Sequence, residues 1–384
     1  MAQHALLSPS AAHRWLHCTA APLLEKDMPD QGSAYAEEGT LAHAYCAKKL
    51  KARLGLDTSG EDAEIEALRD KYHTGEMDEH TDTYEAIVWG KYNAALKRTK
   101  DAQLLVEVRL DFGKWMPDGF GTADAVIIAD GCMEVVDFKY GKGVRVEAED
   151  NPQMRIYAAG AYDQFSIEYD IRSVRMTIVQ PRIDNLSEAE TTSEELLAWA
   201  DGELKRKAEE AYGGNGYQVP GEWCRFCKVR ACCKALAQNC VAAVKDAPDP
   251  KLLRKEDIES TYLPLLPTIK TWLAGIEEYT LQQALDGVDY KGYKLVEGRS
   301  VRKIIDPEAV KAALAEAGYK AEDYMKPAEL RTITDLEKGF GKKNFGTLCG
   351  QYIAKPQGKP TLVPDTDKRP AYNSAADDFK GIGA

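Results

Sequence analysis

The segment GTADAVIIADGCMEVVDFKYGKG contains two aspartates and a lysine in a pattern that could hold a metal ion. Asp130-Gly131 separates two apolar runs, which is the strongest short-range signal of a β-hairpin with a two-residue type I′ turn. Such a turn places Asp124 directly opposite Asp137, with the two Cβ atoms about 4.5–5.5 Å apart. Two carboxylates at this separation repel each other unless a cation lies between them. The hairpin therefore predicts a cation site.

Lys139 follows Asp137 by two residues, so strand alternation places both side chains on the same face. Carboxylate ligands of this kind favour Mg²⁺ or Mn²⁺. Such an ion polarises a phosphoryl oxygen and lowers the pKa of a bound water, while the lysine stabilises developing charge. The alternative is a surface hairpin in which Asp124 and Lys139 are ordinary strand-end charges. A shift of one residue in the turn would remove the opposition of the carboxylates.

Four short motifs, in this order along the chain, resemble those of the RecB-like branch of the PD-(D/E)XK nucleases. The motifs are Gly39-x-x-x-His43, Gly121-x-x-Asp124, Asp137-x-Lys139 and Gln153-x-x-x-Tyr157. The metal ligands that the resemblance implies are His43, Asp124, Asp137 and the backbone carbonyl of Phe138. The catalytic residues that it implies are Lys139, Asp137, Asp124, Gln153 and Tyr157. In this interpretation the glutamine and the tyrosine orient the lysine or contact the DNA backbone.

Each of these residues also has a simpler interpretation. His43 taken alone is more often a hydrogen-bonded helix histidine than a ligand, and Tyr157 taken alone is more often a core residue. Glu107 in LLVEVRL could add a further carboxylate, although a solvent-facing strand glutamate is the favoured interpretation. The order and spacing of all four motifs favour the nuclease site over these separate explanations.

The nine cysteines are distributed unevenly, with four of them in the segment WCRFCKVRACC. Two cysteines three residues apart can bind one metal, and a third can return to it five or six residues later. The same nuclease branch includes members with an iron–sulfur cluster held by one cysteine before the core and C-x2-C-x5-C after it. The ligands of a structural [4Fe-4S] cluster that this resemblance implies are Cys18, Cys224, Cys227 and Cys233, with Cys232 as the alternative.

Two other interpretations of the cysteines stay open. Cys224, Cys227, Cys232 and Cys233 could bind Zn²⁺ without a distant partner, or the thiols could be reduced and free of metal. We rank the iron–sulfur cluster first because of Cys18, zinc second and free thiols third. The scattered cysteines that we expect to be small buried hydrophobic residues are Cys46, Cys132, Cys240 and Cys349.

Hydrophobic periodicity indicates the elements that position these residues. Helices are predicted at residues 9–17, from Gly39-Thr40, within 61–99, and at 153–162, 187–211, 255–286 and 307–317. Strands are predicted at residues 104–112, 121–129, 132–140 and 173–183, with a hairpin at 291–304. The resemblance implies an α/β fold with a PD-(D/E)XK restriction-endonuclease-like core. This core is a mixed sheet flanked by helices, with a helical insertion and a smaller α+β C-terminal region.

The length of 384 residues predicts two to three domains. We expect a RecB-like nuclease domain at 1–245 that includes the cysteine cluster, an α+β domain of unknown role at 246–354, and an extended tail at 355–384. The net charge of −12 excludes a generally basic nucleic-acid coat, but it permits a nuclease with an acidic metal site. The sequence shows neither a secretory signal nor an apolar run of membrane-spanning length, so we expect a cytoplasmic protein.

The expected function is that of a metal-dependent DNA exonuclease. Exonuclease activity is favoured over sequence-specific cleavage because no DNA-reading module is evident. The alternatives are a catalytically silent DNA-binding or assembly protein on the same fold, and a processing endonuclease within a complex. The C-terminal region, which includes ITDLEKGFGKKNFGTLCGQYIAKPQGKPTLVP, resembles a phage-associated group of RecB-like proteins. This implies a role in phage DNA recombination, replication or repair in a bacterial host cell.

The expected partners follow from the same resemblance. They are DNA and a single-strand-binding or recombination protein, with no membrane contact. The sequence does not predict the oligomeric state.

Overall fold

The computed structural model describes residues 5–28, 34–245, 254–298, 302–325, 330–354 and 360–364. The chain divides into two compact units, Met1–Leu273 and Ala274–Ala384. The first unit extends beyond the predicted boundary at residue 245 and takes in the first half of helix α11 (Leu263–Leu285). The physical reason is that Ile269 and Trp272 of α11 pack against the apolar cluster around Leu236 and Cys240.

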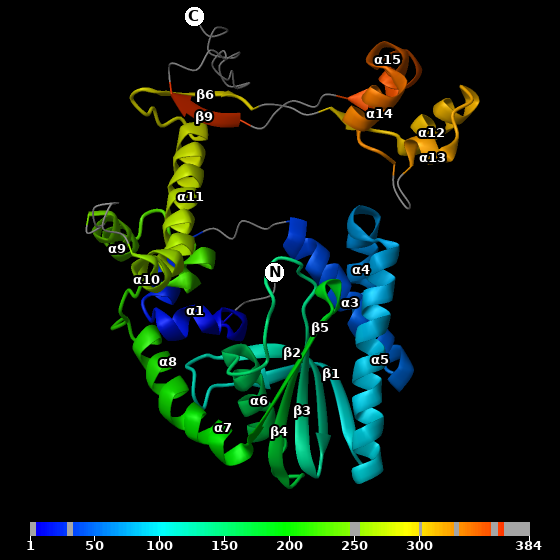
Figure 1. Cartoon of the computed structure of the whole chain (residues 1–384). Helices are drawn as coiled ribbons and strands as arrows, with labels where there is room; N and C mark the ends of the chain where they lie inside the picture. The colour runs from blue at the N-terminus through cyan, green and yellow to red at the C-terminus, as the bar shows by residue number, and fades with distance from the viewer. Residues whose placement is uncertain are drawn as a thin grey trace, which may run out of the picture. The chain divides into compact units, whose positions relative to one another are not determined.

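A five-stranded mixed sheet lies at the centre of the first unit (Figure 1), with the strand order β1-β2-β3-β4-β5. The strands are β1 (Gln103–Asp111), β2 (Phe120–Ala129), β3 (Gly131–Phe138), β4 (Ile171–Gln180) and β5 (Asn185–Thr192). Neighbouring strands are antiparallel except for β3 and β4, which are parallel. Helix α6 (Pro152–Phe165) joins this parallel pair, as a crossover connection requires.

Helices cover both faces of this sheet (Figure 1). One face is covered by α3 (Ala34–Leu54), α4 (Ser59–Tyr72) and α5 (Gly75–Arg98), and the other by α6, α7 (Ser193–Trp199) and α8 (Lys205–Tyr212). Strand alternation supplies both cores, because Val136 and Phe138 of β3 face one cluster and Met133 and Val135 face the other. The prediction of an α/β fold with a mixed sheet flanked by helices is confirmed.

The N-terminal helices lie against the cysteine-rich segment of the same unit. These short helices are the 3₁₀ turn η1 (Pro9–Ala11), α1 (Ala12–His17) and α2 (Ala21–Glu25). Helix α1 contacts the 3₁₀ turn η4 (Glu222–Phe226), which precedes α9 (Lys234–Lys245). Residues that begin the chain and residues that follow the sheet are therefore neighbours in the fold. The helix predicted at 9–17 is confirmed.

Two of the predicted helices differ from those in the structure. Residues 187–211 begin as the edge strand β5 and become helical only at Ser193, where Thr192 and Glu195 form a capping box. β5 is predominantly polar and exposed, so its residues resemble a charged helix face. Helix α3 already includes Ala34 and runs through Gly39, where a Cβ atom would meet nothing within 4 Å.

The second unit contains the C-terminal half of α11, short helices and two small sheets. A cluster of apolar side chains, including Val310, Leu314 and Phe345, joins its short helices. The hairpin predicted at 291–304 was wrong, because its two strands pair with distant segments instead of with each other. The pairs are β6 (Tyr293–Glu297) with β9 (Pro360–Pro364), and β7 (Lys303–Ile304) with β8 (Ile353–Ala354).

The remaining helical segments of the described chain are short. The helices are α10 (Lys255–Asp257), α12 (Pro307–Glu316), α13 (Ala321–Tyr324), α14 (Ile333–Phe340) and α15 (Lys342–Cys349). The 3₁₀ turns are η2 (Pro181–Ile183) and η7 (Gly350–Tyr352), and the π-helical turns are η3 (Ala200–Leu204) and η6 (Ile258–Tyr262). No helix in the described ranges combines the length and the apolar character needed to cross a bilayer.

Candidate metal centre and cysteine cluster

The register of the β2–β3 hairpin agrees with the sequence prediction. Val126 pairs with Val135, and the last pair of the ladder is Ala125 with Val136. One step further, the backbone N–H of Phe138 donates to Asp124 Oδ2 at 2.7 Å, in place of a regular strand pair. The two strands therefore separate where Asp124 and Asp137 lie.

The turn of this hairpin is not of type I′. That type requires positive φ at both central residues, whereas only Gly131 has it, at 81°. The start of β4 fixes the turn instead. The backbone N–H of Gly131 donates to the carbonyl of Asp170 at 2.8 Å, and the Asp170 N–H donates to Asp130 Oδ1 at 3.2 Å. The predicted register is present although the predicted turn geometry is not.

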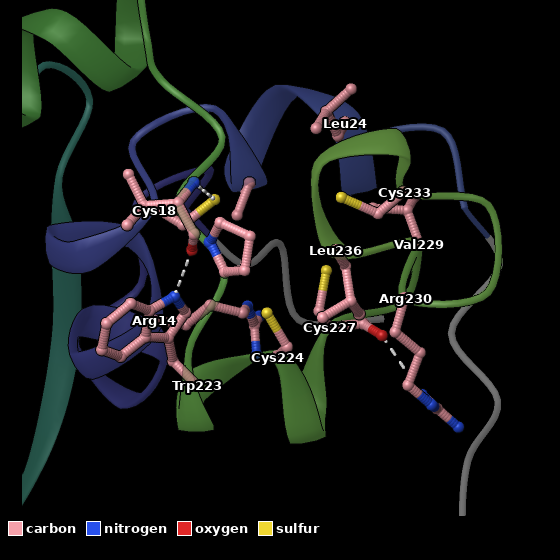
Figure 2. Close-up of a pocket in the computed structure, with 13 residues that line it drawn as sticks. Arg14, Cys18, Leu24, Trp223, Cys224, Cys227, Val229, Arg230, Cys233 and Leu236 are labelled. Atoms are coloured by element: carbon pink, nitrogen blue, oxygen red, sulfur yellow. Dashed lines mark hydrogen bonds between the residues drawn. The ribbon is translucent and has the colours of Figure 1, made fainter. Parts of the chain in front are cut away.

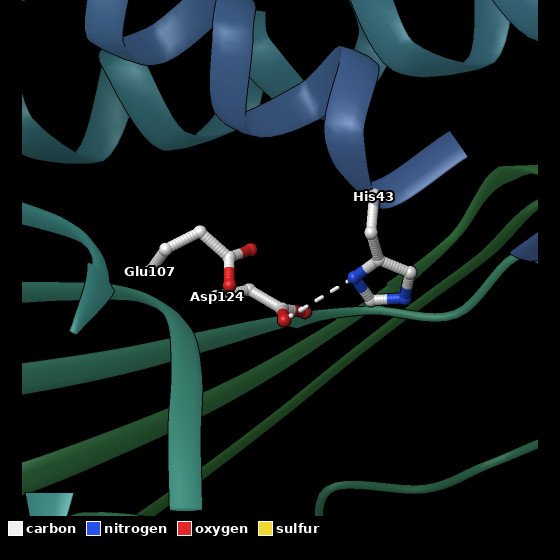
Figure 3. Close-up of side chains that lie close together, drawn as sticks. All are labelled: His43, Glu107 and Asp124. Atoms are coloured by element: carbon white, nitrogen blue, oxygen red, sulfur yellow. Dashed lines mark ion pairs between the residues drawn. The ribbon is translucent and has the colours of Figure 1, made fainter. Parts of the chain in front are cut away.

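Glu107 interrupts the pairing of β1 with β2. Val106 pairs with Ala125 and Val108 with Ala123, whereas Glu107, between them, has a φ of 51°. A non-glycine residue in this left-handed region costs about 1–3 kcal/mol and is typical of functional sites. The ligand atoms of Glu107, Asp124 and His43 lie within 4.8 Å of one another (Figure 3). The interpretation of Glu107 as a solvent-facing strand residue was wrong, because this backbone kink directs its half-buried carboxylate towards Asp124.

His43 reaches this site from helix α3 and lies on the side of Asp124 away from Glu107 (Figure 3). Its Nδ1 lies 3.2 Å from Asp124 Oδ1, and its ring packs edge-on against Phe138 with centroids 5.4 Å apart. Burial lowers the pKa of His43, but the charges of Asp124 and Asp137 outweigh this and raise it to about 9. The imidazolium therefore compensates part of the negative charge.

The two neighbouring carboxyl groups respond in opposite directions to this environment. Burial and the charge of Asp124 raise the pKa of Glu107 to about 7. Burial also raises the pKa of Asp124, yet the charge and hydrogen bond of His43 outweigh this and hold it below its ordinary value. The negative charge of Asp124 is thus balanced by the imidazolium of His43, whereas the ionised form of Glu107 would be stabilised by a further positive charge.

Asp137, Lys139 and Gln153 form a second group on the α6 side of the sheet. Lys139 Nζ lies 3.0 Å from Asp137 Oδ2 and donates to Gln153 Oε1 at 2.9 Å. The Gln153 amide donates in turn to Asp137 Oδ1 at 3.1 Å. Asp137 is only 3% exposed, and its buried Oδ2 has the ammonium of Lys139 as a charged neighbour at 3.0 Å.

The charges within this second group support one another. Burial and the charge of Asp124 raise the pKa of Asp137 above its ordinary value, although Lys139 opposes them. Burial lowers the pKa of Lys139, but the charges of Asp137 and Asp124 outweigh it, so the pKa is raised. The side chain of Lys139 is thus held as a half-buried ammonium between an acid and an amide.

Helix α6 positions Gln153 and Tyr157, one turn apart. The side chain of Asn151 accepts from the N–H of Met154 at 3.2 Å, and Pro152 stands at the first helical position, a favourable start for the helix predicted at 153–162. Tyr157 is 8% exposed and packs in the core, with its ring centroid 6.1 Å from that of Phe112. Burial and the charge of Asp137 raise its pKa.

The four cysteines predicted to act as cluster ligands line one small cavity of about 20 Å³ (Figure 2). They are Cys18, Cys224, Cys227 and Cys233. The backbone N–H of Val219 donates to Cys18 Sγ at 3.5 Å, and that of Gly221 donates to Cys224 Sγ at 3.4 Å. Cys232 is exposed and does not line the cavity, so the structure brings Cys18 into the group instead of this alternative.

Burial of three of these thiols raises their pKa and favours the protonated form in the absence of a metal. Burial and the charge of Glu25 raise the pKa of Cys227 to about 12, and burial also raises the pKa of Cys18 and Cys224. Among the residues that the structure describes, no three cysteine sulfurs lie within 4.8 Å of one another. Tetrahedral zinc, with Zn–S bonds of about 2.3 Å, holds its sulfurs about 3.8 Å apart.

Polar contacts join the two segments that supply these cysteines. Arg14 donates to the carbonyl of Phe226 at 3.0 Å and pairs with Glu25 at 2.9 Å. Glu25 also accepts from the N–H of Lys228 at 2.6 Å. The N-terminal helices are therefore attached to the cysteine segment by contacts that do not involve sulfur.

Three of the four scattered cysteines are buried, as predicted. These are Cys46, Cys240 and Cys349, whereas Cys132 is half-buried. Cys240 packs with Cys224 and Leu236 in the apolar cluster behind the cavity. Its position shows how a packing cysteine and a candidate ligand can be close neighbours.

Comparison with known proteins matches this chain to solved structures and to a family. One of the solved structures, titled "Crystal structure of SSO0001", is 14% identical in sequence, and the match covers 56% of this chain and 92% of that chain. Its TM-score of 0.23 is too low to support any conclusion about this fold. A family profile matches residues 4–370, almost the whole chain. The chain therefore belongs to the family described as "Protein of unknown function (DUF2800)".

Proposed function

We propose that this protein is a metal-dependent DNA nuclease with a RecB-like PD-(D/E)XK core, and that it degrades DNA from the ends. The observation that carries the proposal is the separation of β2 from β3 at Asp124 and Asp137. There, the buried Asp137 pairs with the ammonium of Lys139, and Asp124 accepts a hydrogen bond from the N–H of Phe138, the residue between them. These residues follow the order of the nuclease motifs. A fold without chemistry would gain little from so many charged groups at one strand end.

The residues present fit a hard divalent cation. Asp137 Oδ2 is a buried oxygen with the ammonium of Lys139 as a charged neighbour, and Glu107 carries an unfavourable charge beside Asp124. Carboxylates and a backbone carbonyl are ligands that suit Mg²⁺ or Mn²⁺. The residues that would hold the ion are His43, Asp124, Asp137 and the carbonyl of Phe138, with Glu107 as an added candidate. When bound, such an ion would polarise a phosphoryl oxygen and activate a water.

The protein's own side chains would orient Lys139 and stabilise the charge that develops on the phosphate. Gln153 and Asp137 hold Lys139 in one orientation, so the ammonium is fixed before substrate arrives. A fixed positive charge would stabilise the negative charge that develops on the phosphate. Tyr157, packed in the core, would hold α6 and therefore Gln153 in register.

We further propose that Cys18, Cys224, Cys227 and Cys233 hold a structural [4Fe-4S] cluster. These four cysteines line one cavity, which brings Cys18 from the N-terminal helices to the three cysteines that follow the sheet. The Zn²⁺ alternative with Cys232 has less support, because that residue is exposed and outside the cavity. The cluster would tie the N-terminal helices to the segment after the sheet.

The biological setting belongs to the same proposal. DNA would be the substrate, in phage recombination, replication or repair within the cytoplasm of a bacterial host cell. A single-strand-binding or recombination protein would be a further partner. This part rests on the resemblance of the motifs and of the C-terminal region.

The deciding experiment is a cleavage assay on linear DNA labelled at the 5′ or 3′ end, and on circles, with Mg²⁺, Mn²⁺ or EDTA. We expect degradation of linear DNA that requires the metal and is lost in Asp137→Ala and Lys139→Ala, with circular dichroism unchanged. Cleavage of circles would indicate an endonuclease instead. Tight binding without degradation would favour a silent DNA-binding protein, and full activity in both variants would refute the proposed site.

A further inference from the structure

The loop that follows the candidate catalytic lysine exposes two cations, Lys142 and Arg145, together with two acids, Glu147 and Glu149. Residues 141–149 connect Lys139 to helix α6, and Gly141 to Arg145 are all exposed. The side chain of Lys142 is 55% exposed and that of Arg145 is 60% exposed. Two cations therefore project into solvent within six residues of Lys139.

The buried side of this loop is fixed by one side chain, Gln180, at the end of β4. Its Nε2 donates to the carbonyls of Gly141 at 2.7 Å and Val144 at 2.8 Å. Its Oε1 accepts from the N–H of Val146 and from the Asn185 amide, both at 3.2 Å. All four hydrogen-bonding positions of this amide are used, and the residue is 1% exposed.

Two residues of β5 extend the same support. Asn185 Nδ2 donates to the carbonyl of Val146 at 2.8 Å, and Ser187 Oγ accepts from the N–H of Ala148 at 2.9 Å. The backbone N–H of Lys139 donates to the carbonyl of Val179, next to Gln180, at 2.9 Å. The ends of β4 and β5 thus hold both the lysine backbone and the loop after it.

Such support is unusual for an exposed connection, since surface loops are normally the mobile part of a fold. The buried amides of Gln180 and Asn185 donate to loop carbonyls and so hold the loop in one conformation. The acids beside its cations do not neutralise them strongly. Lys142 lies 3.8 Å from Glu76 and Arg145 pairs with Glu147 at 2.5 Å, all with side chains more than half exposed and thus screened by solvent.

We propose that residues 141–149 form a preorganised phosphate-binding loop that holds the DNA backbone beside the phosphate at the metal centre. Lys142 and Arg145 would contact the backbone phosphates, and Gln180 with Asn185 would act as positioning residues beneath them. This inference rests on the proposed nuclease function, because the loop would bind the DNA strand that the metal centre cleaves. It adds to that function a sequence-independent DNA contact outside the four motifs.

The first test measures binding in EDTA, so that cleavage does not interfere. Fluorescence anisotropy of a short fluorescein-labelled single strand and of its duplex would be recorded over a range of salt concentrations. We expect the Lys142→Gln/Arg145→Gln variant to bind on the order of tenfold more weakly. Its slope of log affinity against log salt should fall by about 0.7 to 0.9 per lost contact. Both residues are exposed, so the variant should keep its fold.

The matched control is Lys100→Gln/Arg172→Gln, which removes the same charge from exposed positions near the opposite end of the sheet. This control should bind like the unmodified protein. An equal loss in the control, an unchanged salt slope in the loop variant, or no DNA binding by the unmodified protein would overturn the inference. If the protein binds but never cleaves, the nuclease proposal fails while the slope comparison still decides the role of the loop.

A second test addresses the support beneath the loop. Gln180→Glu keeps the size of the side chain but replaces the amide that donates to two carbonyls with a carboxylate oxygen. We expect faster amide hydrogen exchange confined to residues 141–149, together with weaker DNA binding in EDTA. Unchanged exchange, or faster exchange with unchanged affinity, would show that this support does not serve DNA binding.

Discussion

At the scale of single residues, the site combines strain and charge that the fold alone does not need. Glu107 has a left-handed backbone in the middle of a strand, and its carboxylate faces Asp124. No local pattern predicts this conformation, because an isolated glutamate between valines has the usual pattern of a solvent-facing strand residue. Asp124 was easier to predict, since the hairpin places it opposite Asp137.

Removal of the charge at Glu107 should stabilise the metal-free protein. Its folded pKa of about 7 lies above the ordinary value, so the ionised form destabilises the fold above that pH. In EDTA at pH 8, we expect Glu107→Gln to raise the free energy of unfolding by on the order of 1 kcal/mol. The gain should shrink as the pH falls from about 7 and disappear below about 4.5, where the glutamate is neutral in both states.

Urea unfolding of both proteins at several pH values would check this prediction. The same variant should bind Mn²⁺ more weakly, which isothermal titration calorimetry would measure. A variant that is less stable than the unmodified protein at pH 8 would contradict the assigned repulsion. Greater stability with weaker metal binding is the expected trade-off at a functional site.

At the scale of elements, local signals predicted what local contacts determine. The hairpin register of β2 and β3 and the start of α6 depend on neighbouring residues, and both were correct. The strand β5 and the pairing of β6 with β9 depend on partners elsewhere in the chain, which no local pattern reveals. The prediction of the turn type was wrong for the same reason, because Asp170, just before β4, binds the turn.

The cap of helix α6 should matter for activity as well as for stability. Asn151 caps the helix that carries Gln153 and also donates to the carbonyl of Glu147 at 2.9 Å. Asn151→Ala should lower the free energy of unfolding by about 1 kcal/mol. It should also reduce cleavage at least several-fold, since Gln153 lies in the first turn and orients Lys139.

The matched control for this prediction is Thr192→Ala, which removes the cap of α7. It should cost a similar free energy of unfolding but leave the cleavage rate unchanged, because α7 supplies no side chain to the candidate metal centre. Equal losses of activity in both variants would mean that Asn151 acts only through stability.

At the scale of the whole molecule, the first unit needs residues beyond the predicted nuclease boundary. Ile269 and Trp272 of α11 pack on the apolar cluster behind the cysteine cavity. A chain that ends after Lys245 should therefore be less stable than one that ends after Leu285, by about 2 kcal/mol for the lost burial. Thermal unfolding of the two truncated proteins measures the difference. Equal midpoints of thermal unfolding would place the domain boundary at residue 245, as predicted from the sequence.

The proposed cluster would link Cys18 to the cysteines that follow the sheet, and its removal gives a further prediction. If Cys18 is a ligand, its bond to the cluster closes a loop of about 200 residues, which restricts the unfolded chain by on the order of 5 kcal/mol at most. Cys18→Ala should therefore lose iron and sulfide and become less stable. It should still fold, because the contacts of Arg14 with Phe226 and Glu25 remain.

Cys232→Ala and Cys240→Ala are matched controls, since one cysteine is exposed and the other packs behind the cavity. Both should keep full iron content after anaerobic purification. Because the candidate metal centre lies on the sheet and the cysteines outside it, Cys18→Ala should retain Mg²⁺-dependent cleavage at temperatures where it stays folded. Full iron in Cys18→Ala, or loss of iron in Cys232→Ala, would shift the ligand set towards the four neighbouring cysteines and make zinc the better assignment.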